Sequence, residues 1–428
     1  MIKIFCIFSI ILFLASCSRF SSIQKEKELQ SLLDKKEYFR LRTALLQEGD
    51  EISDEKKIYF RAFVRNAFNE NHQSAEDIEA LLTQYASSFN DSIRANLLET
   101  QSDNYFKTFE YAKSARADSE LLKHYQHILD SERVSDIKND LVVRNALVNI
   151  PPQQVSITGS DTINWTKDKI GLMEIPVKKG DSVFSCIFDT RANISSITKT
   201  YAAKLGLKML DASFDVGSGL TGITFKTGLG IADSIYIGNI LIRNAVFQVM
   251  PDEVFYFATI KFSINVIIGY PVIQQLKEMH IYQDGKMIVP EHPAKSNLNN
   301  LAMDKLNPVL SVRTGNDTLC FHFDSGATSS DFYSTYFEKY KGKILSKGEK
   351  HTVETGGAGG SLKTEIYVLD SLNLYIGDKK AIIKDAGIRI TPIDKHSNEK
   401  FYGNLGQDLV KQFNEMILNF DDMYIEFR

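Results

Sequence analysis

Residues 184–192 read FSCIFDTRA, and residues 319–327 read LCFHFDSGA. Each stretch is an apolar segment that ends in an aspartate, which is followed by a residue with a hydroxyl group, one variable residue and an alanine. Short apolar runs of this kind, bounded by turns that contain glycine, are typical of β-strands. The two stretches therefore predict two strands of the same kind, with Asp189 at the end of one and Asp324 at the end of the other.

Three further landmarks follow both stretches in the same order: a glycine-rich turn, an apolar strand that ends in glycine, and a hydrophobic pair before a glycine. They lie at residues 217–222, 234–238 and 266–269 in the first copy and at residues 356–360, 372–377 and 401–406 in the second. Gly269 follows Asp189 by 80 residues, and Gly403 follows Asp324 by 79. The matching order and spacing predict a duplicated β unit.

The part of the chain before this unit has a different texture. Residues 24–149 contain no proline, and their apolar residues recur at helical spacing. This pattern predicts an all-α domain of helical hairpins at residues 22–150, with a weak resemblance to tetratricopeptide repeats. Helix starts are predicted at Ser53 and Ser74, because each hydroxyl residue precedes acidic residues.

The texture changes at the pair Pro151-Pro152. From there on, period-two alternation and turns that contain glycine predict a mainly β region. Because the repeated landmarks divide this region into two similar halves, we expect one lobe at residues 153–292 and a second lobe at residues 300–428. The chain is thus expected to be multidomain, all-α first and all-β afterwards.

The N-terminus carries a short apolar segment. Lys3 is followed by almost wholly apolar residues from 4 to 15, the pattern of a secretion signal and shorter than the about 20 apolar residues that span a bilayer. The ending Leu14-Ala15-Ser16-Cys17 resembles the lipobox of bacterial lipoproteins. The resemblance implies a lipoprotein signal peptide at residues 1–17 and lipidation of Cys17. The protein would then be lipid-anchored in the bacterial cell envelope, on the periplasmic or surface face of the outer membrane. An ordinary cleaved signal is the alternative.

Composition excludes several other classes of protein. The chain has 50 basic and 54 acidic residues, a net charge of -4 and no basic stripe, so no nucleic-acid partner is expected. The motifs of P-loop proteins, zinc metallopeptidases and serine hydrolases are missing from the sequence, so neither a metal nor a cofactor is predicted. Cys186 and Cys320 differ in strand parity and are expected to be buried free thiols. His124 and His127 are expected to face solvent.

The duplicated pattern resembles the aspartic peptidases, specifically the retropepsin-like, gag-type aspartyl proteases, over roughly residues 157–428. The shared markers are two hydrophobic residues before Asp-Ser/Thr-Gly-Ala, a flap that bears glycines, and a downstream hydrophobic pair before a glycine. The resemblance implies an all-β, two-lobed acid-protease fold of the pepsin and retropepsin kind. Retropepsins assemble two identical chains, whereas this chain carries both halves, as pepsin-like enzymes do.

The resemblance also implies roles for individual residues. Asp189 and Asp324 are the expected catalytic pair, because peptide hydrolysis without a metal needs one carboxylate that accepts a proton from water and a second carboxyl that donates one. Two carboxyls about 3 Å apart share one proton. The other expected residues support this pair (Thr190, Ser325 and Gly326), lie in substrate-binding flaps (Gly217, Gly219, Gly222, Gly357 and Gly359) or are structural glycines after a hydrophobic pair (Gly269 and Gly403). His322 is interpreted as a side chain on the other face of its strand and not as a catalytic base.

One position departs from the family pattern. Gly326 is the glycine that follows Asp-Ser in the second copy, but Arg191 stands at this position in the first. Glycine lets the backbone lie against a substrate. An arginine could block the cleft, or it could place a cation beside the pair, which favours ionised carboxylates and opposes a shared proton.

Three hypotheses for the function follow. The first is an aspartic endopeptidase that hydrolyses extended segments of peptides or unfolded proteins in the cell envelope. The second is a catalytically impaired homologue that binds peptides or proteins as an envelope lipoprotein. The third is that the helical domain binds a protein partner and scaffolds an envelope complex. In all three, the only contact with the membrane is the lipid anchor.

The lipoprotein prediction has a direct test. Metabolic labelling with a fatty-acid probe should mark the wild type and should not mark Cys17→Ala, because the thiol of Cys17 is the expected site of lipid attachment. Equal labelling of both proteins would contradict the prediction.

Overall fold

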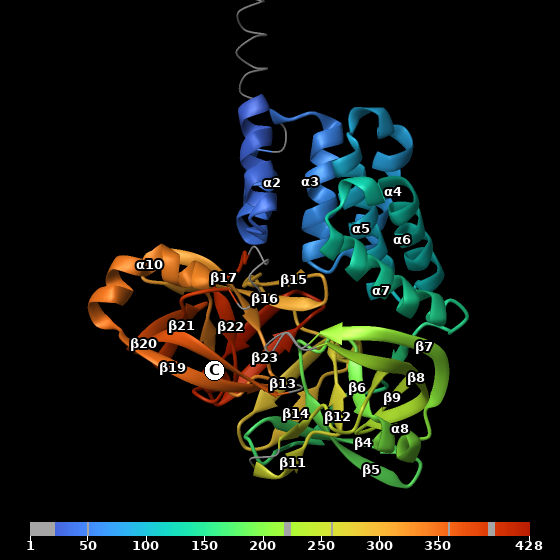
Figure 1. The fold of residues 1–428 in the computed structure, drawn as a ribbon, viewed down its shortest axis with the longest axis vertical. Coiled ribbons are helices and arrows are strands. Elements are labelled where there is room, and N and C mark those ends of the chain that lie inside the picture. Colours follow the sequence, from blue (N-terminus) through green and yellow to red (C-terminus); the bar gives the residue numbers. More distant parts are fainter. Residues whose placement is uncertain (1–21, 49–50, 218–223, 258–259, 358–359, 393–398) are drawn as a thin grey trace, which may run out of the picture.

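The computed structural model describes residues 22–48, 51–217, 224–257, 260–357, 360–392 and 399–428. A helical region is followed by a large, mostly β region, and the change falls at Pro151-Pro152 (Figure 1). The predicted order, all-α and then mostly β, is therefore confirmed. Within the described ranges, no helix is both long enough and apolar enough to cross a membrane.

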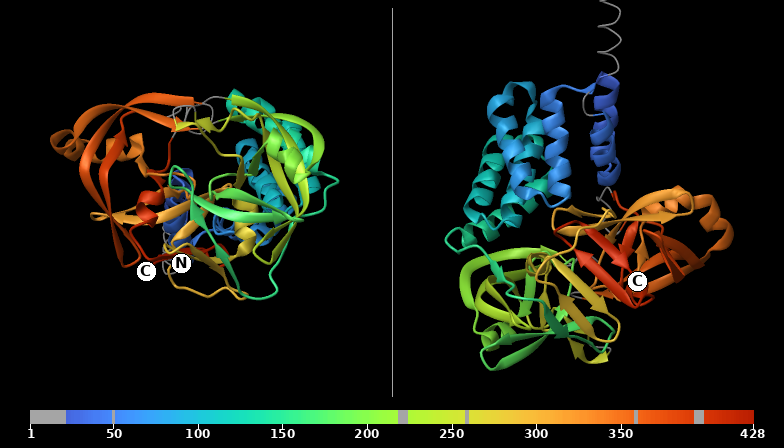
Figure 2. Two further views of the ribbon diagram at one scale, coloured as in Figure 1. Left: turned by 90° about the horizontal axis from the view of Figure 1, so that it is seen from below. Right: turned by 180° about the vertical axis from the view of Figure 1, so that it is seen from behind.

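The helical region packs as a row of neighbouring helices (Figures 1 and 2). A helix at residues 22–34 is followed by α2 (Tyr38–Glu48), α3 (Asp54–Ala67), α4 (Asn71–Gln84), α5 (Asp91–Lys107), α6 (Tyr111–Tyr125) and α7 (Ser131–Leu147). The start of α3 directly after Ser53 is as predicted. The start predicted at Ser74 is wrong, since α4 begins at Asn71. Ser74 is instead buried inside α4, where its hydroxyl donates to the carbonyl of Ala62 in α3 at 2.7 Å.

The first half of the β region forms a nine-stranded sheet. Its order is β1-β9-β6-β12-β5-β4-β8-β7, with β3 beside β4. The strands are β1 (Gln154–Ser156), β3 (Thr166–Lys167), β4 (Met173–Lys179), β5 (Ser182–Phe188), β6 (Ser195–Thr198), β7 (Lys208–Gly217), β8 (Thr224–Ile237), β9 (Ile240–Met250) and β12 (Val266–Ile268).

The second half forms an eight-stranded sheet in the order β15-β16-β17-β22-β18-β21-β20-β19. The strands are β15 (Leu301–Asp304), β16 (Asn307–Thr314), β17 (Asp317–Phe323), β18 (Asp331–Phe332), β19 (Glu349–Gly357), β20 (Gly360–Ile376), β21 (Lys379–Arg389) and β22 (Gly403–Leu405). The two large sheets occupy separate parts of the β region (Figure 2).

A third sheet of five strands contains strands from both halves, in the order β2-β14-β13-β23-β24. Its central pairing joins β13 to β23, with Glu278 opposite Asn419 and Tyr282 opposite Glu415. The strands are β2 (Asp161–Asn164), β13 (Glu278–Tyr282), β14 (Lys286–Val289), β23 (Glu415–Asn419) and β24 (Tyr424–Phe427). This shared sheet fixes the two halves against each other through backbone hydrogen bonds.

The two halves repeat the same local connections. β5 lies parallel to β12, with Phe188 opposite Ile268, and β17 lies parallel to β22, with Phe323 opposite Leu405. A helix follows each aspartate loop, with 7 residues in the first half and 14 in the second, and a helix of 4 residues follows each inner strand. These helices are α8 (Lys199–Leu205) and α10 (Ser334–Lys347) after the loops, and α9 (Tyr270–Ile273) and α11 (Gln407–Val410) after β12 and β22.

This register changes which glycine of the second half is equivalent to Gly269. Gly269 directly follows β12, and the residue that directly follows β22 is Gly406 rather than Gly403. Gly403 opens β22, and a Cβ there would come within 2.5 Å of the carbonyl oxygen of Asp331. The prediction took the first hydrophobic pair before a glycine, Phe401-Tyr402, although the hydrogen-bonded strand begins after that pair.

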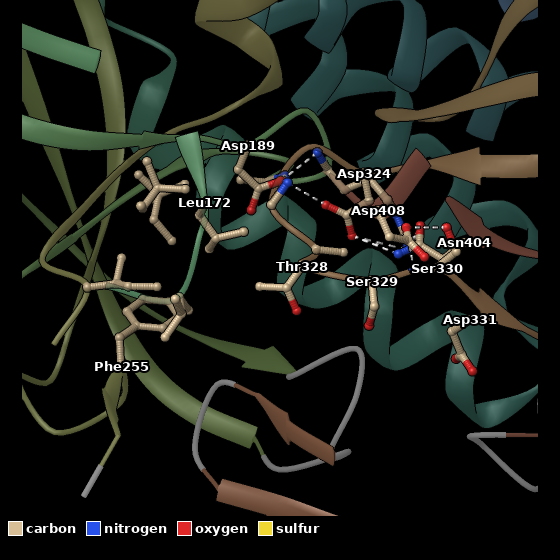
Figure 3. A pocket seen from close by; sticks show the side chains of 18 of the residues that line it. Leu172, Asp189, Phe255, Asp324, Thr328, Ser329, Ser330, Asp331, Asn404 and Asp408 are labelled. Atoms are coloured by element: carbon tan, nitrogen blue, oxygen red, sulfur yellow. Dashed lines mark hydrogen bonds and ion pairs between the residues drawn. The ribbon is translucent and has the colours of Figure 1, made fainter. Parts of the chain in front are cut away.

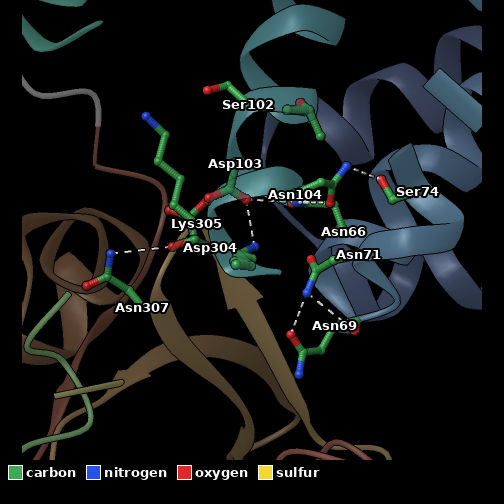
Figure 4. A network of polar contacts seen from close by, with 12 residues as sticks. Asn66, Asn69, Asn71, Ser74, Ser102, Asp103, Asn104, Asp304, Lys305 and Asn307 are labelled. Atoms are coloured by element: carbon green, nitrogen blue, oxygen red, sulfur yellow. Dashed lines mark hydrogen bonds and ion pairs between the residues drawn. The ribbon is translucent and has the colours of Figure 1, made fainter. Parts of the chain in front are cut away.

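A polar network lies where the helical region meets β15 and β16 (Figure 4). The carboxylate of Asp304 accepts hydrogen bonds from Lys36 and from the hydroxyl of Tyr38, each at 2.8 Å. Lys305 forms an ion pair with Glu99 of α5 at 2.9 Å. The helical region therefore holds the turn between β15 and β16 through charged contacts.

A second contact joins α7 to the first large sheet. The side chain of Asn139 both accepts from the backbone N–H of Asp215 in β7 and donates to its carbonyl. On the same helix, Leu147 is 0% exposed and packs in one cluster with Phe214 and Leu229 of the sheet. β7 is the terminal strand of its sheet, so α7 covers an edge that would otherwise be open.

We predict that Leu147→Ala destabilises the protein by about 2–5 kcal/mol, because it removes a buried side chain and leaves a cavity between α7 and the sheet. Leu46→Ala is the matched control, since Leu46 is 79% exposed and should change the free energy of unfolding by less than about 0.5 kcal/mol. Denaturant unfolding of the three proteins measures both effects. Equal stability of the two variants would contradict the packing of α7 on this sheet.

Candidate active site

The two aspartates occupy equivalent places in the two halves. Asp189 directly follows β5, and its backbone N–H donates to Ile268 at 3.0 Å. Asp324 directly follows β17, and its backbone N–H donates to Leu405 at 2.9 Å. The parallel inner strands β12 and β22 thus fix the point at which each aspartate leaves its sheet.

The hydroxyl residues after the aspartates cross between the halves. Thr190 Oγ1 donates to the carbonyl of Phe323 at 3.1 Å and accepts from the N–H of Ser325 at 3.1 Å. Ser325 Oγ donates to the carbonyl of Phe188 at 2.7 Å and accepts from the N–H of Thr190 at 3.0 Å. Both hydroxyls are buried, so these four hydrogen bonds, here called the hydroxyl lattice, are shielded from water.

The lattice brings the loop of one aspartate against the carboxylate of the other. A Cβ on Gly326 would lie 2.4 Å from Cγ and from Oδ2 of Asp189. No real side chain fits at that distance, so glycine is required here by close approach. The predicted supporting residues Thr190, Ser325 and Gly326 therefore all lie where the two loops meet, and Figure 3 shows Asp189 and Asp324 in the same pocket.

Each carboxylate accepts hydrogen bonds from its own loop. Asp189 Oδ1 accepts from the N–H of Arg191 at 2.8 Å and from that of Ala192 at 3.1 Å. Asp324 Oδ1 accepts from the N–H of Gly326 at 2.9 Å. The two loops therefore have matching backbone geometry although one contains arginine where the other contains glycine.

The side chain of Arg191 reaches across to the second half. Its Nη1 donates to Asn404 Oδ1 at 3.1 Å, and its Nε donates to Asn307 Oδ1 at 3.4 Å. The same Nη1 lies 3.8 Å from Asp324 Oδ2. The guanidinium therefore faces the aspartate pair and is held there by two amides of the second half.

Burial and charge act in opposite directions on the pair. Burial first, and then the nearby charge of Asp324, raise the pKa of Asp189 to about 7, against the lowering effects of the Arg191 hydrogen bond and cation. Burial, followed by the Arg191 cation, lowers the pKa of His322 to about 3. His322 is therefore neutral at ordinary pH, and the centroid of its ring lies 4.5 Å from that of the Phe401 ring.

The aspartates lie in a cleft of about 670 Å³. Its wall from the first half is mainly apolar, with Leu172 and Phe255, and its wall from the second half is mainly polar, with Thr328, Ser329 and Asp331 (Figure 3). Hairpins of both halves also line it, through Val216, Gly217 and Phe225 of β7–β8 and Val353, Thr364 and Ile366 of β19–β20.

The predicted flap glycines are only partly described. Gly217 ends β7 and lines the cleft, and Gly357 is the last residue of β19, paired with Gly360. Gly219, Gly222 and Gly359 lie outside the described residues, as does Cys17. The described parts of both hairpins thus reach the cleft, and the role of these glycines in a flap stays a prediction.

Sequence reasoning missed a second repeated pair of residues. Ser195 Oγ accepts from the N–H of Gly269 at 3.0 Å, and Ser330 Oγ accepts from the N–H of Gly406 at 3.1 Å. Each serine stands six positions after the aspartate of its half, at Asp189 and Asp324. That common spacing was present in the sequence and identifies both serines.

Asn404 was also missed, and the sequence offered little to find it. It stands opposite His322 in the pairing of β22 with β17, where the first half has Ile267 opposite Ile187. Its Nδ2 donates to Asp324 Oδ2 at 3.0 Å. Because Asn404 has an isoleucine as its counterpart in the first half, comparison of the two copies could not identify it as a site residue.

The remaining predicted side chains are placed as follows. Cys186 and Cys320 are free thiols, as predicted, but Cys320 is only partly buried. His124 and His127 are exposed, as predicted. Among the described residues, no group of three or more histidine, cysteine or acidic side chains could hold a metal ion.

No protein-family model matches the chain, and no curated protein matches it significantly.

We predict that the hydroxyl lattice contributes to stability as a unit. Thr190→Val should cost about 1–3 kcal/mol, because the N–H of Ser325 would be left buried without an acceptor. Ser325→Ala should cost a similar amount, and the double variant should cost less than the sum because both changes disrupt one network. Thr352→Val on exposed β19 is the control. Additive effects, measured by denaturant unfolding, would argue against a coupled lattice.

Proposed function

We propose that this chain is an aspartic endopeptidase that hydrolyses extended peptide segments. The observation that carries the proposal is the placement of Asp189 and Asp324 at one point of a cleft, on two loops joined by the hydroxyl lattice. Two carboxyls in one partly buried site tend to share a proton, which gives the acid and the base that peptide hydrolysis needs. We also propose that the β region has a two-lobed fold of the pepsin and retropepsin kind.

The reaction would use water as its only co-reactant. One carboxylate accepts a proton from water while the water oxygen attacks the carbonyl carbon of the peptide, and the other carboxyl gives its proton to the carbonyl oxygen. The C–N bond of the tetrahedral product then breaks. The leaving nitrogen takes the proton that the first carboxylate accepted from water, and a hydroxyl of the tetrahedral product returns a proton to the second carboxylate, so that the pair again holds one proton. The hairpins β7–β8 and β19–β20 offer backbone groups beside the cleft, which suits a substrate in extended conformation.

A second candidate function is supported by Arg191. Its guanidinium faces the pair at 3.8 Å from Asp324, and a cation there opposes a shared proton. The chain would then be a catalytically impaired homologue that binds peptides in the same cleft. Against this, burial and Asp324 keep the pKa of Asp189 raised to about 7 despite the cation. We therefore favour the endopeptidase.

The proposed location is the cell envelope, with lipid attached at Cys17 and no other membrane contact. Unfolded proteins or peptides would be the substrates there. The helical region, which contacts both large sheets, remains a candidate site for a protein partner.

Cleavage of fluorogenic peptides from about pH 3 to 8 tests the proposal, since this range spans carboxyl titration. The wild type should be most active at mildly acidic pH. Its activity should fall as pH rises through about 7, because Asp189, with its raised pKa, then loses the proton that the pair must share. Asp324→Asn and Asp189→Asn should each lower kcat/KM by at least about 10²-fold.

Arg191→Gly separates the two candidate functions. If the endopeptidase proposal is correct, the wild type cleaves peptides without this change. An inert wild type together with an active Arg191→Gly would support the impaired homologue. Inactivity of both on a diverse peptide library, with the fold intact by circular dichroism, would exclude the endopeptidase.

A further inference from the structure

The side chain of Asn404 lies between Arg191 and Asp324. Its Oδ1 accepts from Arg191 Nη1 at 3.1 Å, and its Nδ2 donates to Asp324 Oδ2 at 3.0 Å. Because a guanidinium has only donors, Arg191 fixes the amide with its oxygen toward the cation. The NH₂ group of Asn404 must then point at Asp324, and a donor can hydrogen-bond only to an oxygen lone pair.

Both oxygens of Asp324 therefore serve as acceptors. Oδ1 accepts from the N–H of Gly326 at 2.9 Å and Oδ2 accepts from Asn404, with the Arg191 cation 3.8 Å away. The Asp324 side chain is only 16% exposed, so these interactions are weakly screened. Hydrogen bonds to the ionised form and a nearby cation both favour a carboxylate.

The hydrogen bonds to the Asp189 carboxylate are distributed differently over its two oxygens. Its Oδ1 accepts both N–H groups of its loop, from Arg191 and Ala192. In the part of the chain that the structure describes, no donor reaches its Oδ2, which faces the backbone of Gly326. This oxygen is free to carry a proton, whereas each oxygen of Asp324 is bound by a donor.

We propose that Arg191 and Asn404 are positioning residues that keep Asp324 the ionised member of the pair and leave the shared proton on Asp189. The inference rests on the proposed function, and it assigns the roles: Asp324 accepts the proton of water and Asp189 donates to the carbonyl oxygen. The departure of Arg191 from the family glycine is then a device that orders the pair, and Asn404 is its second part. The raised pKa of Asp189 agrees with this order.

Other charged and titratable groups face the same cluster. Tyr333, which precedes α10, and Asp189 act on Arg191 together with Asp324. Nδ1 of His322 in β17 lies 3.5 Å from the hydroxyl of Tyr333, and the charges of Asp304 and Lys36 also act on the His322 ring. His322 is neutral, and Asp304 is neutralised by Lys36 at 2.8 Å, so Arg191 remains the cation nearest to Asp324 among the residues that the structure describes.

The test is a titration of the two carboxyls that needs no substrate. The full chain is labelled with ¹³C at the aspartate side-chain carboxyl, and the two signals are assigned from their loss in Asp189→Asn and in Asp324→Asn. In the wild type, the Asp324 signal should follow the first ionisation step of the pair and the Asp189 signal the second. In Arg191→Met, the Asp324 signal should move to higher pH relative to the Asp189 signal, because the cation that favours the ionised form of the carboxyl is removed.

Three further variants make the comparison specific. Asn404→Leu should move the Asp324 step upward, and Arg191→Lys, which keeps the charge, should retain the order of the two steps. Arg313→Met removes the same charge from an exposed position outside the cleft, and Asn373→Leu makes the same change on exposed β20, so neither should move the steps. In peptide cleavage, Arg191→Met should move both limbs of the pH profile upward, because the cation acts on both carboxyls.

The outcomes for the inference and for the function are distinct. Ionisation of Asp189 before Asp324, or a shift in Arg191→Met no larger than in Arg313→Met, overturns the inference even if the wild type cleaves peptides. The expected order of ionisation in a wild type that cleaves nothing supports the assignment of charge and refutes the endopeptidase proposal.

Discussion

The hydroxyl lattice is the contact on which the site depends. Thr190 and Ser325 each give and accept one hydrogen bond across the boundary between the two halves. Because both hydroxyls are buried, either loop could move only by leaving backbone groups without partners. The shared five-stranded sheet makes the halves one body on a larger scale, and the lattice fixes the two aspartate loops within it.

The duplication makes the site nearly symmetric, and three residues break that symmetry. Matching loops carry Asp189 and Asp324, and matching serines hold Gly269 and Gly406. Arg191, Asn404 and Asn307 have no counterparts of the same chemistry, and both asparagines accept a hydrogen bond from Arg191. Two identical carboxyls in identical surroundings would have no reason to differ in protonation, so an asymmetric cluster is a physical means of giving each its own role.

The helical region is connected to this asymmetric cluster. Lys36 and Tyr38 hold Asp304, which lies in the same β15–β16 turn as Asn307, the residue that receives Arg191 Nε. On the other side, α7 pairs with β7 through Asn139, and β7 lines the cleft at Val216. The helices therefore contact both the support of Arg191 and a hairpin beside the cleft, through polar contacts and through the apolar packing of Leu147 against the sheet.

The sequence by itself determined the local pattern and its repetition. Helical spacing before Pro151 and alternation after it gave the two regions, because periodicity depends on which side chains must be buried. The repeated aspartate stretches identified both aspartates and both lattice hydroxyls. Equivalent residues in two copies can be found by comparing the copies, without information on spatial contacts.

The sequence did not give the points that depend on pairing between distant segments. It matched Gly403 rather than Gly406 to Gly269, because a strand's register is set by its hydrogen-bonded partner, here β17. It misplaced the start of α4, because Ser74 bonds to a neighbouring helix rather than capping its own. The direction of the Arg191 side chain, which distinguishes the two candidate functions, could not be predicted from the sequence. Only the tertiary structure brings Asn404 and Asn307, more than 100 positions away, to its guanidinium, since a long side chain takes its direction from the partners that the fold provides.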